Sequence, residues 1–316
     1  MPFPLEVVIP LRWNSARPRR DDEVGELAAY LRALSAWCDV TVVDGSDDVL
    51  RRQHIDAWSA HALVIRPEGT GTNGKVVGCL TGLRAARHDL VVIADDDVRH
   101  DATTLAALMD ELGTADLVRP QNVYERWPWP ARWDFARCLV NRAFGVDWPG
   151  TFALRRDAIL AVGGWSTEVL FENLQLVRTA SAHGLRVVNA PWLVVPRTPP
   201  TAGHFWSQRV RQAYDDFAQP GRLVAELALL PGLLALGTWR PQALAVPLAA
   251  AVVVGEIGRR RFGGVASPRT SALWCPLWLL ERSVCVWIAL GSWLRGGVRY
   301  HGRRVRHAAL RVGASP

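Results

Sequence analysis

The chain has 316 residues, of which 49% are apolar and 21% charged, and a formal net charge of +7. This length and apolar fraction are enough for one substantial α/β core, with about a hundred residues left over. The arginines that carry the charge follow hydrophobic segments and form no recognition helix, so we expect no nucleic-acid partner. The five cysteines include no Cys-x-x-Cys pair, so neither a zinc site nor a disulfide framework is indicated.

The first part of the chain alternates apolar runs with helical patterns. The runs span residues 5–10, 40–44, 61–65 and 90–94, and a helical pattern at 21–36 links the first two. This alternation is typical of parallel strands joined by right-handed crossovers. We therefore expect an α/β fold with a mostly parallel sheet flanked by helices.

Three consecutive acids, Asp95, Asp96 and Asp97, follow the apolar run at 90–94. Ligands of open α/β sheets bind beyond the carboxyl ends of the strands, and adjacent carboxylates there are destabilising unless a cation neutralises them. Mg²⁺ or Mn²⁺ takes one or two carboxylates and completes its coordination with water and substrate phosphates. The pattern favours a metal site for a nucleotide diphosphate, and the alternative is that the acids cap the next helix.

Lys75 is the only lysine in the chain, and it begins an apolar helical pattern that leads back into the run at 90–94. A compact, mobile ammonium suits a diphosphate oxygen better than a guanidinium does. We interpret Lys75 as a donor-binding residue, with an ordinary solvated surface lysine as the alternative.

Several motifs in order resemble a family 2 glycosyltransferase with the GT-A fold, over about residues 5 to 215. The resemblance implies a nucleotide-diphospho-sugar transferase with a mixed, mostly parallel sheet, and an inverting reaction. The motifs are Val7-Val8-Ile9-Pro10, Val42-Val43-Asp44-Gly45-Ser46, Gly74-Lys75, Asp95-Asp96-Asp97, Gly150 to Arg156, Gly163-Gly164-Trp165 and Phe171-Glu172-Asn173-Leu174.

By this resemblance, the donor site holds the UDP or GDP part of a nucleotide sugar. Pro10 and Asp44 would line it, with Asp44 on the base or ribose or, alternatively, only holding its own turn. Asp95 and Asp97 correspond to the Asp-x-Asp motif: Asp97 would bind the metal directly, and Asp95 the ribose or a water. Asp96, also on the donor side, would point away.

The catalytic motif departs from the family, which usually has Glu-Asp or Asp-Asp where this chain has Glu172 and Asn173. An asparagine amide cannot take the acceptor proton at neutral pH. Three explanations stay open: Glu172 is the base, a nearby acid such as Glu168 serves, or the activity is altered or lost. We favour Glu172, whose alternative role is a helix N-terminal acid.

Gln208 and Arg211 resemble the Gln-x-x-Arg-Trp segment of membrane-bound members such as ceramide glucosyltransferases and polysaccharide synthases. Arg211 would clamp the donor diphosphate, and the alternative is an amphipathic surface helix with solvated arginines. Gln212 replaces the tryptophan of that segment. Its loss favours transfer of a single sugar over processive polymer synthesis.

The composition changes after Gly221, so we expect a catalytic domain at 1–221 and a membrane-associated region at 222–316. The apolar stretches 223–238 and 243–258 indicate a membrane hairpin, although each is shorter than a comfortable span and re-entrant or interfacial helices stay open. The three arginines after the second stretch favour a cytoplasmic exit. We therefore expect a cell-membrane protein with a cytoplasmic catalytic domain.

A third apolar segment, 272–294, is long enough to span but carries Glu281 and Arg282 at its centre. The tail at 295–311 has six arginines and no acid, and a span would put it outside. The charge rule therefore favours an interfacial helix on the inner leaflet, and a soluble helical domain is the alternative.

Together these features indicate a membrane-attached glycosyltransferase that moves one sugar from a nucleotide diphosphate to a lipid or glycan acceptor. A nucleotidyl or phosphosugar transferase would also use the acids and Lys75, but it usually has a glycine-rich loop near the N-terminus, and residues 10–20 contain no glycine. A non-catalytic scaffold that binds a nucleotide sugar is the other alternative, and Asn173 is the feature that favours it.

Overall fold

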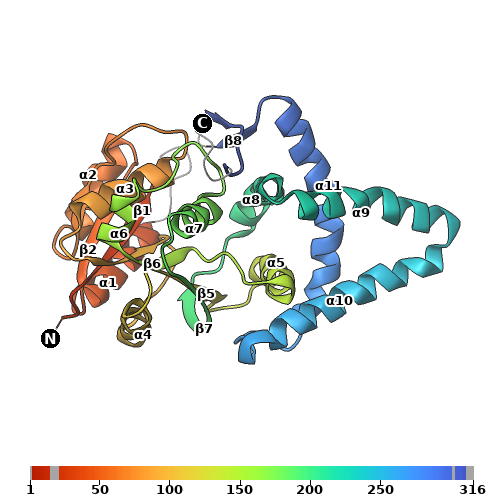
Figure 1. The fold of residues 1–316 in the computed structure, drawn as a ribbon, viewed down its shortest axis with the longest axis horizontal. Helices are drawn as coiled ribbons and strands as arrows, with labels where there is room; N and C mark the ends of the chain where they lie inside the picture. The colour runs from red at the N-terminus through yellow and green to blue at the C-terminus, as the bar shows by residue number, and fades with distance from the viewer. Residues whose placement is uncertain (1, 15–20, 301–302, 311–316) are drawn as a thin grey trace. The chain divides into compact units, whose positions relative to one another are not determined.

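The structure is a computed structural model and describes residues 2–14, 21–300 and 303–310. The glycine-free stretch at 10–20 and the arginine-rich tail at 295–311 therefore lie partly outside the described residues. Within them, the elements follow the order shown in Figure 1.

Packing of the backbone divides the chain into two compact units that each contain discontinuous segments. The second unit contains segments from before and after residue 221. The expected boundary between a domain at 1–221 and a region at 222–316 stays a prediction. The first unit comprises Met1–Asn122, Pro149–Thr167 and Glu172–Pro196, and the second comprises Val123–Trp148, Glu168–Phe171 and Arg197–Pro316.

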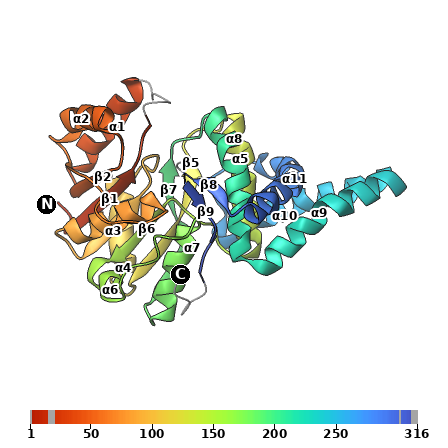
Figure 2. The ribbon, with the colours of Figure 1, turned by 90° about the horizontal axis from the view of Figure 1, so that it is seen from above.

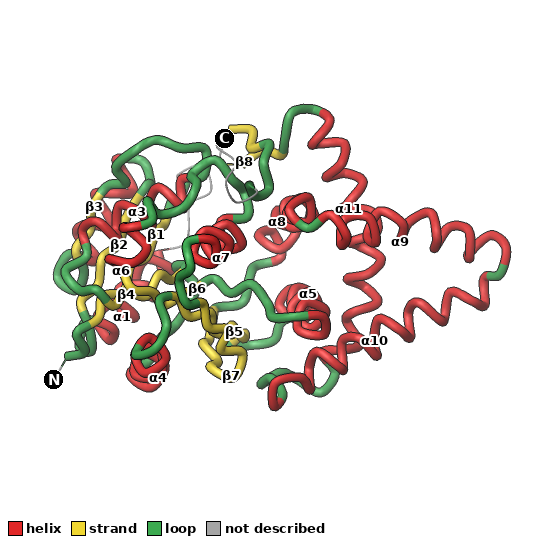
Figure 3. Tube along the Cα trace, in the orientation of Figure 1, coloured by secondary structure: helices red, strands yellow, loops and turns green. Residues whose placement is uncertain are grey.

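A seven-stranded sheet in the order β3-β2-β1-β4-β6-β5-β7 forms the centre of the first unit. The first four strands along the chain pair in parallel, and β6 is antiparallel to both β4 and β5. This confirms the mixed, mostly parallel sheet expected from the sequence. Figure 3 shows its strands in yellow. The strands are β1 (Leu5–Leu11), β2 (Asp39–Asp44), β3 (Leu63–Ile65), β4 (Leu90–Ala94), β5 (Leu117–Tyr124), β6 (Thr151–Arg155) and β7 (Val187–Arg197).

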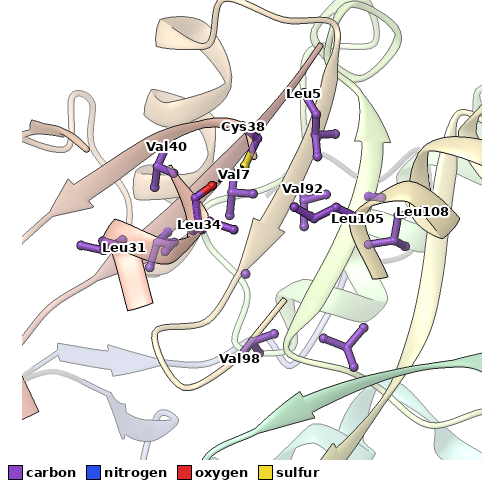
Figure 4. Packing of buried hydrophobic residues seen from close by; sticks show 14 of the residues in the cluster. Leu5, Val7, Leu31, Leu34, Cys38, Val40, Val92, Val98, Leu105 and Leu108 are labelled. Atoms are coloured by element: carbon purple, nitrogen blue, oxygen red, sulfur yellow. Dashed lines mark hydrogen bonds between the residues drawn. The ribbon is translucent and has the colours of Figure 1, made fainter. Parts of the chain in front are cut away.

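Helices cover both faces of this sheet, because successive residues of each strand point to opposite faces. Leu5 and Val7 of β1 pack with Leu31 of α1 and Leu105 of α4, as Figure 4 shows, while Val8 packs on the other face with α3. The helices of this unit are α1 (Asp21–Leu34), α2 (Asp48–Trp58), α3 (Gly74–Ala85), α4 (Ala102–Leu112), α6 (Arg156–Ala161) and α7 (Glu172–Ala182).

The register of the parallel strands brings the expected site residues to one edge. Leu11 at the end of β1 pairs with Asp44 at the end of β2, and Val8 pairs with Ile93 of β4. The carboxyl ends of β1, β2 and β4 therefore lie side by side, where ligands of open α/β sheets bind.

The second unit is mainly helical. Within it, α5 packs against α10 and α11, and α8 packs against α11 (Figure 2). Its helices are α5 (Trp129–Phe144), α8 (Ala202–Tyr214), α9 (Pro220–Trp239), α10 (Ala245–Arg260) and α11 (Cys275–Leu294), and a short hairpin, β8 (Val298–Tyr300) and β9 (Arg303–Val305), follows α11.

Three helical segments in this unit are long and apolar enough to cross a membrane: Pro220–Trp239, Pro241–Gly263 and Ser271–Leu294. The first two contain α9 and α10, so the helical pair expected from the sequence is present. Along α9, Glu226 is the buried residue, and most of the other side chains are half-buried or exposed.

The charges at the centre of α11 are directed into the protein. Arg282 is fully buried, and its Nη1 lies 2.9 Å from a carboxylate oxygen of Asp216 and 3.8 Å from one of Glu226. Arg222 contacts the same two acids at 3.0 and 2.9 Å. Glu281 is also directed inward, with a carboxylate oxygen 3.7 Å from Nη1 of Arg209. Charges that face protein partners do not meet lipid, so Glu281 and Arg282 no longer argue against a spanning α11.

We expect Arg282→Leu to lower the free energy of unfolding by about 3–5 kcal/mol, because it leaves two buried carboxylates without this partner. Arg260→Leu is the control, since Arg260 is 74% exposed and pairs only at the surface with Glu256; its loss costs about 1 kcal/mol or less. Denaturant unfolding in detergent measures both. Equal stabilities for the two variants would contradict the structural role of Arg282.

Candidate active site

The chain turns sharply where β4 ends. The Val98 N–H donates to the Asp95 carbonyl at 3.0 Å, and the Asp95 N–H donates to the Gly150 carbonyl at 2.8 Å. A Cβ atom at Gly150 would lie 2.4 Å from Oδ2 of Asp95, so only glycine allows this approach. The Gly150 motif and the acidic motif, distant in sequence, thus form one wall of the site.

Lys75 reaches this wall from the start of α3. The buried Asn73 side chain caps that helix by accepting hydrogen bonds from the N–H groups of Lys75 and Val76. The Lys75 Nζ atom lies 2.5 Å from Oδ1 of Asp95 and 2.9 Å from Oε1 of Glu172. The Lys75 ammonium therefore contacts both Asp95, expected on the donor side, and Glu172, expected as the base for the acceptor.

Burial alone would lower the pKa of Lys75, but the carboxylates of Asp95 and Glu172 outweigh burial and raise this pKa well above its ordinary value. Lys75 is therefore a fixed positive charge at any working pH.

Glu172 is the first residue of α7 and is only 8% exposed. The neighbouring Asn173 donates from Nδ2 to the Pro149 carbonyl at 2.9 Å. Asn173 thus ties the first turn of α7 to Pro149, the residue before Gly150. The other acid considered from the sequence, Glu168, belongs to the second unit.

The side chain of Asp96 accepts a hydrogen bond of 2.6 Å from Nε1 of Trp13. Trp13 is nearly buried, and its ring packs edge-on against His54 and Trp58. Sequence reasoning missed Trp13, although an aromatic residue just beyond the first strand of such a sheet is a usable signal.

Asp44 is buried at the end of β2. It accepts hydrogen bonds from Nδ1 of His54 at 2.7 Å and from the Ser46 N–H at 2.8 Å. His54, on α2, is a second residue that sequence reasoning missed. Burial would raise the pKa of Asp44, but these hydrogen bonds outweigh it and lower the pKa. Pro10 is buried on β1, against Gly78 of α3.

Gln208 and Arg211 lie on α8 in the second unit, whereas the acids and Lys75 lie in the first. Gln208 donates from Nε2 to Oγ of Ser207 at 3.1 Å, and the Arg211 guanidinium lies 5.2 Å from the ring centre of Tyr300. Their assignment to the donor diphosphate stays a prediction.

No cluster of three or more His, Cys, Asp and Glu side chains suited to hold a metal occurs among the described residues. Mg²⁺ and Mn²⁺ usually bind one or two protein carboxylates together with substrate phosphates and water. Asp95 and Asp97, both half-buried at the end of β4, supply such a pair. The residues therefore fit the expected metal.

The family model for the glycosyltransferase-like family 2 matches residues 39–214. The chain belongs to this family. Membership and fold confirm the transferase class expected from the sequence, whereas the resemblance to its membrane-bound members stays a prediction.

Solved structures of glycosyltransferases are similar to this chain. The mannosyltransferase PcManGT from Pyrobaculum calidifontis, solved with GDP-Man and Mn²⁺, is 20% identical with a TM-score of 0.53, over 91% of this chain and 89% of that one. Glucosyl-3-phosphoglycerate synthase from Mycobacterium tuberculosis is 20% identical with a TM-score of 0.42, over 62% and 72%. The search of curated proteins gave no match.

The buried pair of Asp44 and His54 makes stability depend on pH. Because the pKa of Asp44 is lowered in the folded state, its contribution is complete above the unfolded value of about 3.9 and is lost as pH falls through the folded value. Asp44→Asn should therefore unfold about 1–3 kcal/mol more easily than wild type at pH 7. Urea unfolding should show this difference shrinking in strong acid, and a difference independent of pH would contradict the assignment.

Proposed function

We propose that this protein transfers a single sugar from a UDP- or GDP-sugar to an acceptor hydroxyl, with inversion, assisted by Mg²⁺ or Mn²⁺. The observation that carries the proposal is the position of Lys75 between Asp95, on the donor side, and Glu172, the candidate base. A transferase of this kind needs a charged donor pocket and a base within one small site.

On the donor side, Asp95 and Asp97 would hold the metal, which when bound neutralises charge on the leaving diphosphate. PcManGT, solved with GDP-Man and Mn²⁺, supports both the donor class and the metal. The Lys75 ammonium, which lies beside Asp95, would add positive charge on the donor side for a diphosphate oxygen.

On the acceptor side, Glu172 would take the proton of the acceptor hydroxyl on its carboxylate. The hydroxyl oxygen then forms a bond to the anomeric carbon while the bond to the diphosphate oxygen breaks, and in-line attack inverts the configuration. Glu172 is little exposed and is oriented by Lys75. Asn173 would act by positioning, since its amide is bonded to the Pro149 carbonyl.

We place the acceptor, a lipid or a glycan, at the cytoplasmic face of the cell membrane. The outward face of α11 supports membrane contact: its large apolar residues there are 38–71% exposed, while Arg282 faces inward. A helix in water has the opposite arrangement, because exposed apolar area is unfavourable there. Arg259, Arg260 and Arg261 at the end of α10 favour the cytoplasmic side. The exposed large apolar residues of α11 are Leu277, Leu280, Val284, Trp287, Ile288, Trp293 and Leu294.

The second candidate function is a scaffold that binds a nucleotide sugar without turnover. Asn173 favours it, because the position at which the family usually has the proton-accepting acid carries an amide.

The test is sugar transfer from a panel of nucleotide sugars by detergent-purified protein, with and without Mn²⁺. Glu172→Gln should lower kcat by about 10²–10⁴-fold, because it removes the base. Asp97→Asn should abolish the response to Mn²⁺, because it removes a metal ligand.

Glu168→Gln is the matched control and should keep near wild-type kcat. Loss of turnover in Glu168→Gln with retention in Glu172→Gln would move the base to Glu168. Nucleotide binding without turnover in the wild type would favour the scaffold.

A further inference from the structure

The segment after α11 returns along the second unit to the residues that precede Glu172. Val298 of β8 pairs with Val305 of β9, and the chain then continues to residues 306–308. Of this segment, only Tyr300, whose ring lies beside Arg211, has been described so far.

Residues 307 and 308 pair with the segment 169–171 as a short parallel bridge. The Leu170 N–H donates to the His307 carbonyl at 2.9 Å, and the Phe171 N–H donates to the Ala308 carbonyl at 2.7 Å. Both Leu170 and Phe171 are buried. Because Glu172 directly follows Phe171 in the chain, these bonds fix the residues from which the candidate base emerges.

Tyr214 holds the other end of this segment. Its buried hydroxyl donates to the Arg306 carbonyl at 2.6 Å. Its ring stacks on Phe217 with centroids 4.9 Å apart, and Phe217 stacks on Trp293 of α11 at 5.9 Å. A continuous set of contacts thus runs from the end of α11 through Tyr214 to residues 306–308.

We propose that residues 306–308, anchored by Tyr214, form a latch that positions Glu172 for catalysis, and that Tyr214 is a positioning residue. The inference rests on the proposed function for the role of Glu172. The alternative is that residues 306–308 only cover apolar surface and have no effect on catalysis. The latch differs from that alternative because it predicts an effect on kcat and on two particular amides.

The first test is Tyr214→Phe in the full chain, with Tyr30→Phe as the matched control. The Tyr30 hydroxyl accepts a hydrogen bond of 2.9 Å from the His100 N–H in the first unit. Burial raises the pKa of both hydroxyls to about 12, so each variant removes one neutral hydroxyl.

We expect Tyr214→Phe to lower kcat about 10-fold with the donor KM changed less than about two-fold, because a small displacement of a reacting group is costly. Tyr30→Phe should leave kcat unchanged. Equal kcat values in the two variants would overturn the proposal.

Hydrogen–deuterium exchange tests the latch without turnover. The amides of Leu170 and Phe171 should exchange faster in Tyr214→Phe, and faster still in a chain that ends at Val305, but not in Tyr30→Phe. If the amides of Leu170 and Phe171 exchange at the wild-type rate both in Tyr214→Phe and in the chain that ends at Val305, the proposal is overturned. Faster exchange in a wild type without any transfer activity would support the latch and reject the proposed function instead.

Discussion

The ion pairs of Lys75 with Asp95 and Glu172 are the constraint on which the candidate site depends. Three separate parts of the fold must be in register for it: the capped start of α3, the end of β4 and the first residue of α7. The cap by Asn73 and the glycine at position 150 both serve this arrangement, since one orients the helix and the other admits Asp95. Without Lys75, the half-buried Asp95 and the buried Glu172 would lose a shared counter-charge.

The helical unit uses charge in a different way. The ion pairs of Arg282 and Arg222 with Asp216 and Glu226 lie inside it, while leucine and tryptophan side chains lie outside. Buried ion pairs contribute little net stability compared with apolar packing, but breaking one is costly. They therefore fix which face of α11 is turned outward, and that face is the apolar one.

Much of the fold and the main chemical residues could be predicted from the sequence. The first four strands were predictable because apolar runs bounded by turns are local signals, whereas β5 and β7 were not predicted. Asp95 and Lys75 stood out because one ends such a run and the other is the only lysine. The partners of these residues were not predictable, because they come from distant segments: Trp13 bonds to Asp96 across 83 positions.

The direction of Arg282 was also not predictable. Composition shows that a charge lies within an apolar helix, but not which side of the helix is packed. The same holds for the pairing of residues 307 and 308 with 170 and 171, since single backbone hydrogen bonds leave no pattern in a sequence.

The central claim is that Lys75 and Glu172 act as one unit. The most direct measurement is a double-mutant cycle on kcat at saturating donor, with Lys75→Met, Glu172→Gln and the double variant. The account predicts that the double variant is about as active as Glu172→Gln alone, with a coupling of about 1.5–3 kcal/mol. If the free-energy loss of the double variant equals the sum of the two single losses, the claim is contradicted.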